Sequence, residues 1–143
     1  MSLVWTRENP PHWDETKATV VGGADEGIFP PFPYKPGDPL PGEWWRVEEE
    51  GKILGYGWME ATWGDAEMLL VIDPAARGRG VGAWVLDRLE EEAASRGLNY
   101  LHNVVQKTHP RREEVTRWFE SNRFEKSPDD ERLMRRIRSA RKP

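Results

Sequence analysis

Apolar residues along the chain follow strand-like spacing in one region and helix-like spacing in another. Two runs rich in aromatic and β-branched residues, 44–47 and 53–58, flank a Glu-Gly-Lys turn at 50–52, which predicts a β-hairpin. A second turn at 63–65 leads into the run 68–72, which is apolar without alternation, as in a strand covered on both faces. These segments predict three strands in an antiparallel meander.

The second half of the chain has mainly helical spacing. Apolar residues four positions apart within 80–96 predict an amphipathic helix that ends at Gly97. Residues 98–105 predict another strand, and the succession of strand, helix and strand predicts a parallel strand pair. Residues 110–122 predict a further helix and 133–137 a last strand.

The beginning of the chain has weaker signals. Residues 3–5 predict a short strand and residues 12–24 a helix, bounded by a Pro-Pro and a Gly-Gly pair. The segment 30–42 contains six prolines, which fix φ and remove donors, so it predicts a stiff, extended connection over the surface. With a basic tail at 138–143, we expect one domain over 1–143 of the mixed α/β class.

Composition narrows the classes of function. The 143 residues include no cysteine, which excludes thiolate zinc sites, iron–sulfur clusters, redox dithiols and cysteine nucleophiles. The three histidines are not closely spaced, so no metal site is expected. Neither a membrane span nor a signal-peptide pattern is evident, so we expect a cytoplasmic protein with no membrane partner.

Charge is unevenly divided along the chain. Residues 1–70 carry 13 acidic and 5 basic side chains, whereas residues 71–143 carry 12 and 16. The first part favours a cationic ligand and the second an anionic one, although the same charges also suit solvated helices and a tail. We expect no nucleic-acid partner. A binder of nucleic acid or phosphate surfaces remains a lesser hypothesis because of basic residues near the C-terminus, which we expect instead to form an exposed terminal tail: Arg135, Arg136, Arg138, Arg141 and Lys142.

The candidate chemistry concentrates in residues 77–83, Arg-Gly-Arg-Gly-Val-Gly-Ala, just before a predicted helix. Alternating glycines leave main-chain amides uncovered, and the helix N-terminus and two arginines add positive charge, which predicts a pyrophosphate cradle. The Gly-Lys-Ser/Thr ending of nucleoside triphosphate loops is absent. The residues Gly78-x-Gly80-x-x-Ala83 match the fingerprint of dinucleotide-binding folds. Those folds also need an acidic residue about twenty positions later, where this chain has Leu-His-Asn at 101–103.

The pattern Arg77-x-x-Gly80-x-Gly82 resembles the Arg/Gln-x-x-Gly-x-Gly/Ala signature of the GNAT superfamily of N-acetyltransferases. The resemblance implies the GNAT fold, in which antiparallel N-terminal strands precede a splayed parallel strand–helix–strand unit with flanking helices. It implies acetyl-CoA as co-substrate and no metal. By position, the pyrophosphate site comprises Arg77, Gly78, Arg79, Gly80, Val81 and Gly82, and the pantetheine arm pairs with the main chain of Leu70, Val71 and Ile72.

The reaction implied by this resemblance is direct transfer of the acetyl group to a primary amine of a small molecule or peptide. In the family, a backbone N–H near a bulge in the fourth strand stabilises the oxyanion. A base must take the ammonium proton. Glu67 is the first candidate, although a solvated carboxylate at a strand end is the more common role for such a residue. His102 is a second candidate and shares a strand face with Tyr100, whereas His109 is expected at the start of a helix.

The sequence departs from the family at the general acid. Family members often carry a tyrosine five residues before a Gly-Phe pair, and alignment on Phe124 puts Phe119 in the tyrosine position and Arg123 in the glycine position. Counting from the preceding strand gives a register about one helical turn longer. Tyr100 and Tyr56 are the candidate substitutes. The missing acid motivates an alternative function, a catalytically weak acyl-CoA-binding module.

The sequence says least about the acceptor substrate. Six of the eight tryptophans lie within residues 1–70, where aromatic faces and carboxylates suit a cationic amine, and where the same rings also suit a core. In the family the first helices shape the acceptor site, and the resemblance is weakest there. No acceptor is therefore inferred, and a homodimer is compatible with the resemblance.

Overall fold

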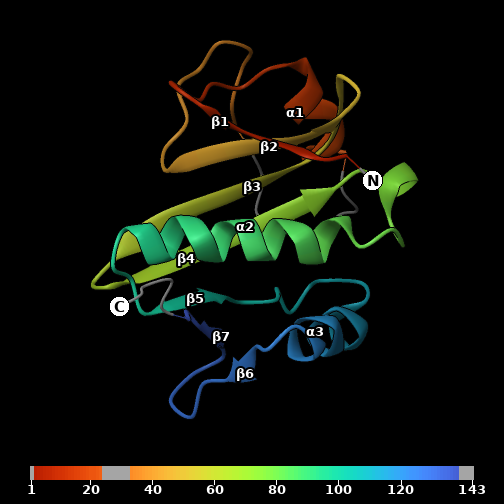
Figure 1. The fold of residues 1–143 in the computed structure, drawn as a ribbon. Helices are drawn as coiled ribbons and strands as arrows, with labels where there is room; N and C mark the ends of the chain where they lie inside the picture. The colour runs from red at the N-terminus through yellow and green to blue at the C-terminus, as the bar shows by residue number, and fades with distance from the viewer. Residues whose placement is uncertain (1, 24–32, 139–143) are drawn as a thin grey trace.

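The computed structural model of the chain describes residues 2–23 and 33–138. Seven strands form one sheet in the order β1-β2-β3-β4-β5-β7-β6, with helices packed against it (Figure 1). The strands are β1 (Val4–Glu8), β2 (Glu43–Glu49), β3 (Lys52–Thr62), β4 (Asp65–Ile72), β5 (Tyr100–Asn103), β6 (Glu125–Lys126) and β7 (Leu133–Arg136). The helices are α1 (Glu15–Val20), the 3-10 turn η1 (Pro74–Ala76), α2 (Val81–Ser95) and α3 (Arg112–Ser121). This mixed architecture confirms the predicted fold class.

The strands β1 to β4 form an antiparallel meander, which confirms the predicted hairpins. Each hairpin closes through two residues of positive φ: Glu50 at 51° and Gly51 at 81°, then Trp63 at 53° and Gly64 at 83°. Turns of this kind match the right-handed twist of the strands they join. The third residue of each predicted turn begins the following strand.

The strands β4 and β5 are parallel, as predicted, but they pair over a short distance. Their register contains only Ala66 opposite Leu101 and Glu67 opposite His102. Beyond that point β4 continues to Ile72, whereas the chain leaves the sheet after β5 ends (Figure 1). Within the described part of the chain, the β5-facing edge of β4 therefore has no strand partner after Glu67.

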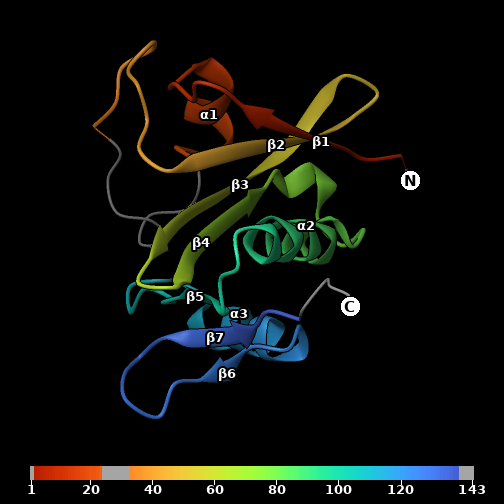
Figure 2. The same ribbon diagram turned by 60° about the vertical axis from the view of Figure 1, so that its left-hand side comes forward.

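Two apolar clusters cover the two faces of the sheet. Side chains alternate along a strand, so neighbouring Trp44 and Trp45 enter different clusters. Trp45 packs with α2 residues such as Val85, and Trp44 packs with Val20 of α1. Figure 2 shows α1 near β1 and β2, away from α2. The expectation that tryptophans belong to the core is thus confirmed for Trp44 and Trp45. Trp63, at a hairpin tip, is instead 98% exposed.

The helix α1 is shorter than the predicted 12–24. Asp14 caps its N-terminus by accepting a hydrogen bond from the Lys17 amide at 2.8 Å. The helix cannot extend back to residue 12 because Asp14 has an extended backbone, with φ of −144° and ψ of 177°. The predicted end near residue 24 lies outside the described residues.

The proline-rich connection is described from residue 33 onward. Its prolines there, Pro33, Pro36, Pro39 and Pro41, are exposed, and no helix or strand is assigned within 33–42. Within this segment the chain turns at residues 36–37. Pro30 and Pro31 lie outside the described residues.

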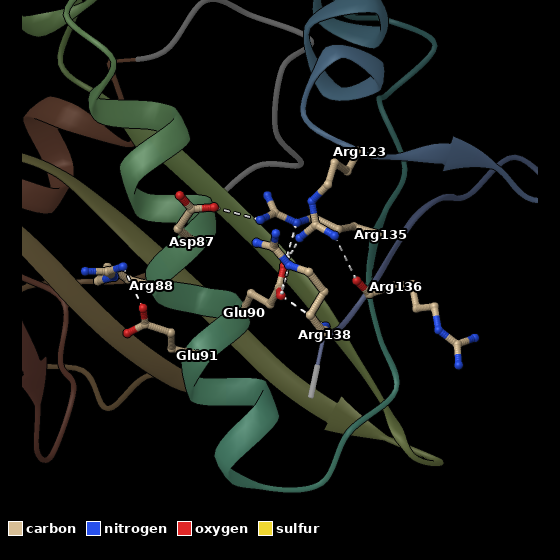
Figure 3. Close-up of polar contacts among 8 residues, drawn as sticks. All are labelled: Asp87, Arg88, Glu90, Glu91, Arg123, Arg135, Arg136 and Arg138. Atoms are coloured by element: carbon tan, nitrogen blue, oxygen red, sulfur yellow. Dashed lines mark hydrogen bonds and ion pairs between the residues drawn. The ribbon is translucent and has the colours of Figure 1, made fainter. Parts of the chain in front are cut away.

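Basic side chains near the end of the described chain form ion pairs with carboxylates on α2 (Figure 3). Arg135 is 2% exposed and donates to Glu90 at 2.8 Å and to Asp87 at 2.7 Å. Arg138 donates to Glu90 through its main-chain N–H at 3.0 Å and its Nε at 3.2 Å, and Arg123 pairs with the same carboxylate. The expectation that Arg135 belongs to an exposed tail is wrong, because β7 carries it into this cluster.

Candidate active site

The glycine-rich segment lies between η1 and α2. Gly78 and Gly80 have φ values of 80° and 81°, in the left-handed region that favours glycine. Gly80 is the N-cap of α2 and has no side chain to accept a hydrogen bond from the first helical turn. No described group accepts a hydrogen bond from the main-chain amides of residues 78–83. Several N–H groups are therefore left for a ligand, at the positive end of the helix.

Beside this segment, a cleft of about 540 Å³ lies between the diverging β4 and β5. It brings together eight predicted cofactor-binding residues: Leu70, Val71, Ile72, Arg77, Gly78, Gly80, Val81 and Gly82. Residues 103–106 and the N-terminal and C-terminal parts of α3 form the opposite wall. Side chains do not fill the space between the parallel strands. The cleft suits an elongated ligand with an anionic end, bound along a free strand edge.

The two arginines of the segment differ in position. Arg77 lines the cleft, and its Nε donates to the Ile72 carbonyl at 3.4 Å. Arg79 does not line the cleft, because its Nη2 donates to both carboxylate oxygens of Glu49, at 2.7 and 2.8 Å. Of these two arginines, only Arg77 therefore brings its charge to the cleft, which Arg111 also lines, and the charge of Arg79 is balanced by Glu49 at the end of β2.

Asn103 is a cleft residue that the sequence did not indicate. It is 6% exposed at the end of β5, and its Oδ1 has no hydrogen-bond partner in the described structure. A buried acceptor without a partner is costly, so an N–H group of a bound ligand would stabilise it. Its position depends on where β5 ends relative to β4, and no motif or spacing marks it.

The comparison with protein families decides the assignment. The model of the acetyltransferase (GNAT) domain matches residues 41–126, from just before β2 to the end of β6. The chain belongs to the GNAT acetyltransferase family. Its cleft thus occurs in a family of acyltransferases, and both the predicted family and the predicted fold class are confirmed. Among curated proteins, no relative matches this GNAT chain.

Solved structures of the same fold come from several bacteria. The ribosomal-protein-S18-alanine N-acetyltransferase of Escherichia coli is 16% identical, with a TM-score of 0.55, 90% of this chain and 79% of that chain covered. A GNAT acetyltransferase of Staphylococcus aureus is 12% identical, with a TM-score of 0.57 and 68% of each chain covered. N-acetylglutamate synthase of Neisseria gonorrhoeae, complexed with coenzyme A and L-arginine, is 18% identical with a TM-score of 0.55. The match covers 66% of this chain but only 24% of that synthase.

The three predicted catalytic residues lie where β4 and β5 begin to diverge. Glu67 and His102 are register partners at the last paired position, so their side chains project on the same face of the sheet. Tyr100, two residues before His102, projects on that face too. Glu67 is exposed, and the other two are half-buried. None of the three lines the cleft itself.

The surroundings of His102 set its protonation state. Burial lowers the pKa of His102 below its ordinary value of 6.5, and the charge of Arg132 lowers it further. The carboxylates of Glu67 and Asp65 act in the opposite direction without reversing the shift. At neutral pH the imidazole is therefore uncharged and able to accept a proton.

The wall near the end of α3 has a ring where the family often has a phenol. Phe119 lines the cleft, is 6% exposed, and contacts the rings of Trp118 and Phe124 edge-on at centroid distances of 5.1 and 5.0 Å. Arg123 has a φ of 71°, a conformation usual for glycine. Tyr56 is buried among Trp44 and Lys17 and does not line this cleft.

His109 lies just before α3 and accepts a hydrogen bond from the Arg111 amide at 3.0 Å through Nδ1, as its expected place at a helix start requires. It also lines the cleft. Among the residues that the structure describes, no group of three or more metal-ligating side chains could hold an ion. Within the same residues, no helix has both the length and the apolar character to cross a bilayer.

The bulge expected in the fourth strand is absent from its pairing with β3. That register runs unbroken from Gly55 opposite Ile72 to Thr62 opposite Asp65, and the shift lies instead between Val47 and Glu48 of β2. The expectation is therefore wrong for this chain. The edge of β4 is opened because β5 ends and the chain turns away, without an inserted residue in β4.

Proposed function

We propose that this GNAT chain transfers an acetyl group from acetyl-CoA to a primary amine of a small molecule or peptide. The observation that supports this most strongly is the cleft in which unpaired amides of residues 78–83 meet the free edge of β4. Diphosphate oxygens would accept hydrogen bonds from those amides and from Arg77. The amides of the pantetheine arm would pair with the main chain of Leu70–Ile72, and one of their N–H groups with Asn103 Oδ1.

In the proposed reaction, the acceptor nitrogen attacks the thioester carbonyl where β4 and β5 separate. A main-chain N–H on the free edge of β4 would stabilise the negative charge that develops on the carbonyl oxygen. The carbon–sulfur bond then breaks, and coenzyme A leaves as a thiolate. No side chain of the enzyme forms a covalent bond in this sequence of steps.

We assign the proton acceptor to Glu67, acting directly or through water. Its carboxylate projects on the same face as Leu69 and Val71, and Leu69 is about 7 Å further along the strand. His102, uncharged at neutral pH and beside Glu67, is the second candidate. Tyr100 shares their face and is the candidate for holding the acceptor or the water.

The absence of a hydroxyl at Phe119 favours a second candidate function, a weakly active acyl-CoA-binding module. A missing general acid need not prevent turnover, because a thiol with a pKa of about 8.5 is a fair leaving group at neutral pH. Calorimetric titration with acetyl-CoA, followed by release of coenzyme A over a panel of pooled amines, separates the two functions. We expect both binding and amine-dependent release. Binding without release over the whole panel would indicate the module, and no binding would contradict both.

A further inference from the structure

A second hollow, which we call the aromatic pocket, lies on the face of the sheet that α1 covers. It has a volume of about 130 Å³. Four rings form much of its wall, those of Tyr34, Trp44, Tyr56 and Trp58, with Leu40 and the middle of β4 completing it. Among the described residues, none that lines the aromatic pocket carries a charge.

The two indoles of the aromatic pocket are held in fixed positions. The Nε1 atoms of Trp44 and Trp58 both donate to the carbonyl of Pro41, at 3.3 and 3.1 Å. Trp44 also contacts Tyr56 edge-on, with 6.0 Å between ring centroids. With their N–H groups satisfied, the indoles have only carbon surface to contact a ligand. Because these side chains are already ordered, they lose less conformational entropy when a ligand binds.

The aromatic pocket and the coenzyme cleft share a wall. Leu69, Leu70 and Val71 of β4 line both. Alternation along the strand places Leu69 and Val71 on the face of Glu67, and Val71 packs with the cluster that contains Trp44. A molecule seated in the aromatic pocket therefore lies beside the strand edge where the thioester would be attacked, and on the side of the proposed base.

We propose that the acceptor is a primary amine joined by a short carbon link to an aromatic ring, and that the ring occupies the aromatic pocket. This inference rests on the proposed function. An apolar cavity of about 150 Å³ accommodates benzene, which is close to the size found here. A polyamine fits poorly, because its second ammonium group would lose water without gaining a carboxylate partner.

The first test compares three amines with the wild-type chain: 2-phenylethylamine, ethylamine and 1,4-diaminobutane. Binding to the chain loaded with coenzyme A is measured by calorimetry, and release of coenzyme A from acetyl-CoA is measured separately. We expect kcat/KM for 2-phenylethylamine to exceed that for ethylamine by about 10- to 100-fold, as burial of the ring predicts. The diamine should perform no better than ethylamine.

A pair of variants locates the ring. Leu40→Phe adds bulk to the aromatic pocket, and Leu54→Phe adds the same bulk at a buried position that lines neither hollow. We expect Leu40→Phe to reduce the preference for 2-phenylethylamine over ethylamine to near one. Leu54→Phe should retain the preference. If Leu40→Phe does not fold, the comparison of amines in the wild-type chain still decides the proposal.

The outcomes separate this inference from the proposed function. Tight binding of 2-phenylethylamine without release of coenzyme A would support the aromatic pocket and contradict the acetyltransferase proposal. Release that is equal for the three amines, or highest with 1,4-diaminobutane, would support acetyl transfer and overturn the inference. Failure of every amine to bind, or an unchanged preference in a folded Leu40→Phe variant, would overturn it as well.

Discussion

Gly82 in the first turn of α2 lies directly against the ring of Trp118 on α3. A Cβ placed on Gly82 would lie 3.0 Å from Cζ2 and 3.3 Å from Cη2 of that ring. These distances are tighter than ordinary packing, and Trp118 belongs to the cleft wall. The glycine therefore permits the close approach of α3 to α2 that shapes this end of the cleft.

Replacing Gly82 with alanine tests this contact. In an unhindered helix, alanine is more favourable than glycine by up to about 1 kcal/mol. Here we expect Gly82→Ala to lower the free energy of unfolding by about 1 kcal/mol, because the added methyl group overpacks the site. In a Trp118→Leu background the same change should be neutral or stabilising. Urea denaturation of the four chains measures the coupling, and additive effects would contradict this account of Gly82.

Phe119 lines the cleft and, by alignment on Phe124, takes the position where we expect a general-acid tyrosine in the family. We expect Phe119→Tyr to raise kcat by up to about 100-fold, the lower end of what a general acid contributes. The gain should be largest below about pH 8.5, where the released thiol is mostly protonated. Phe124→Tyr is the matched control, because Phe124 is 2% exposed and does not line the cleft. Steady-state release of coenzyme A measures both, and equal kcat values in wild type and Phe119→Tyr would exclude this role.

The assignment of the base predicts different effects at two carboxylates on one sheet face. Glu67→Gln should lower kcat by about 10²-fold or more. Glu60→Gln should change little, since Glu60 is the exposed cross-strand partner of Glu67. If His102 is the base instead, kcat of the wild-type chain falls at a pH below 6.5, because the pKa of His102 is lowered. His102→Gln should then remove this fall. A Glu67→Gln profile that matches wild type would eliminate Glu67.

Stability should depend on pH through Glu90. Burial alone would raise the pKa of Glu90, but hydrogen bonds from Arg138 and the charges of Arg135 and Arg123 hold the pKa below its ordinary value of 4.5 (Figure 3). The carboxylate therefore stabilises the fold above that value, and this contribution is lost as the pH falls through the lowered pKa. At pH 7, Glu90→Gln should cost on the order of 3 kcal/mol.

The control for Glu90 is on the same helix. Glu91 is exposed and pairs with Arg88 at 2.6 Å, so Glu91→Gln should cost at most about 1 kcal/mol. Thermal unfolding of both variants at pH 7 and pH 3 measures the effect. The deficit of Glu90→Gln should shrink at the lower pH. A deficit of the same size at both pH values would show that the charge of Glu90 is not its source.

Periodicity predicted the elements that carry long apolar patterns. The strands β2 to β4 and the helix α2 occur within a few residues of their predicted bounds, because their side chains pack against a face defined by local spacing. The strand β6 has two exposed residues and exists through its pairing with β7, so no local pattern indicates it.

The site was predictable only where it is made of main chain. Glycines in sequence indicate exposed amides, and eight of the predicted cofactor residues line one cleft. Contacts between distant segments leave no local pattern in the sequence. The ion pair of Arg79 with Glu49 and the place of Asn103 in the cleft, where β5 ends, could therefore not be predicted. The positions of Glu67 and His102 followed from strand register, which the sequence alone did not establish.

One matched pair of glycines tests whether amides at the start of α2 hold the diphosphate of coenzyme A. Gly80 and Gly51 both have a φ of 81°, and a Cβ on either would meet no atom within 4 Å. A leucine at either position therefore carries a similar backbone strain of about 1–2 kcal/mol, but only Gly80 borders the cleft. Calorimetric titration with coenzyme A should show at least about tenfold weaker binding for Gly80→Leu, equivalent to 1.4 kcal/mol, and wild-type affinity for Gly51→Leu. Wild-type affinity in a folded Gly80→Leu chain would contradict the account.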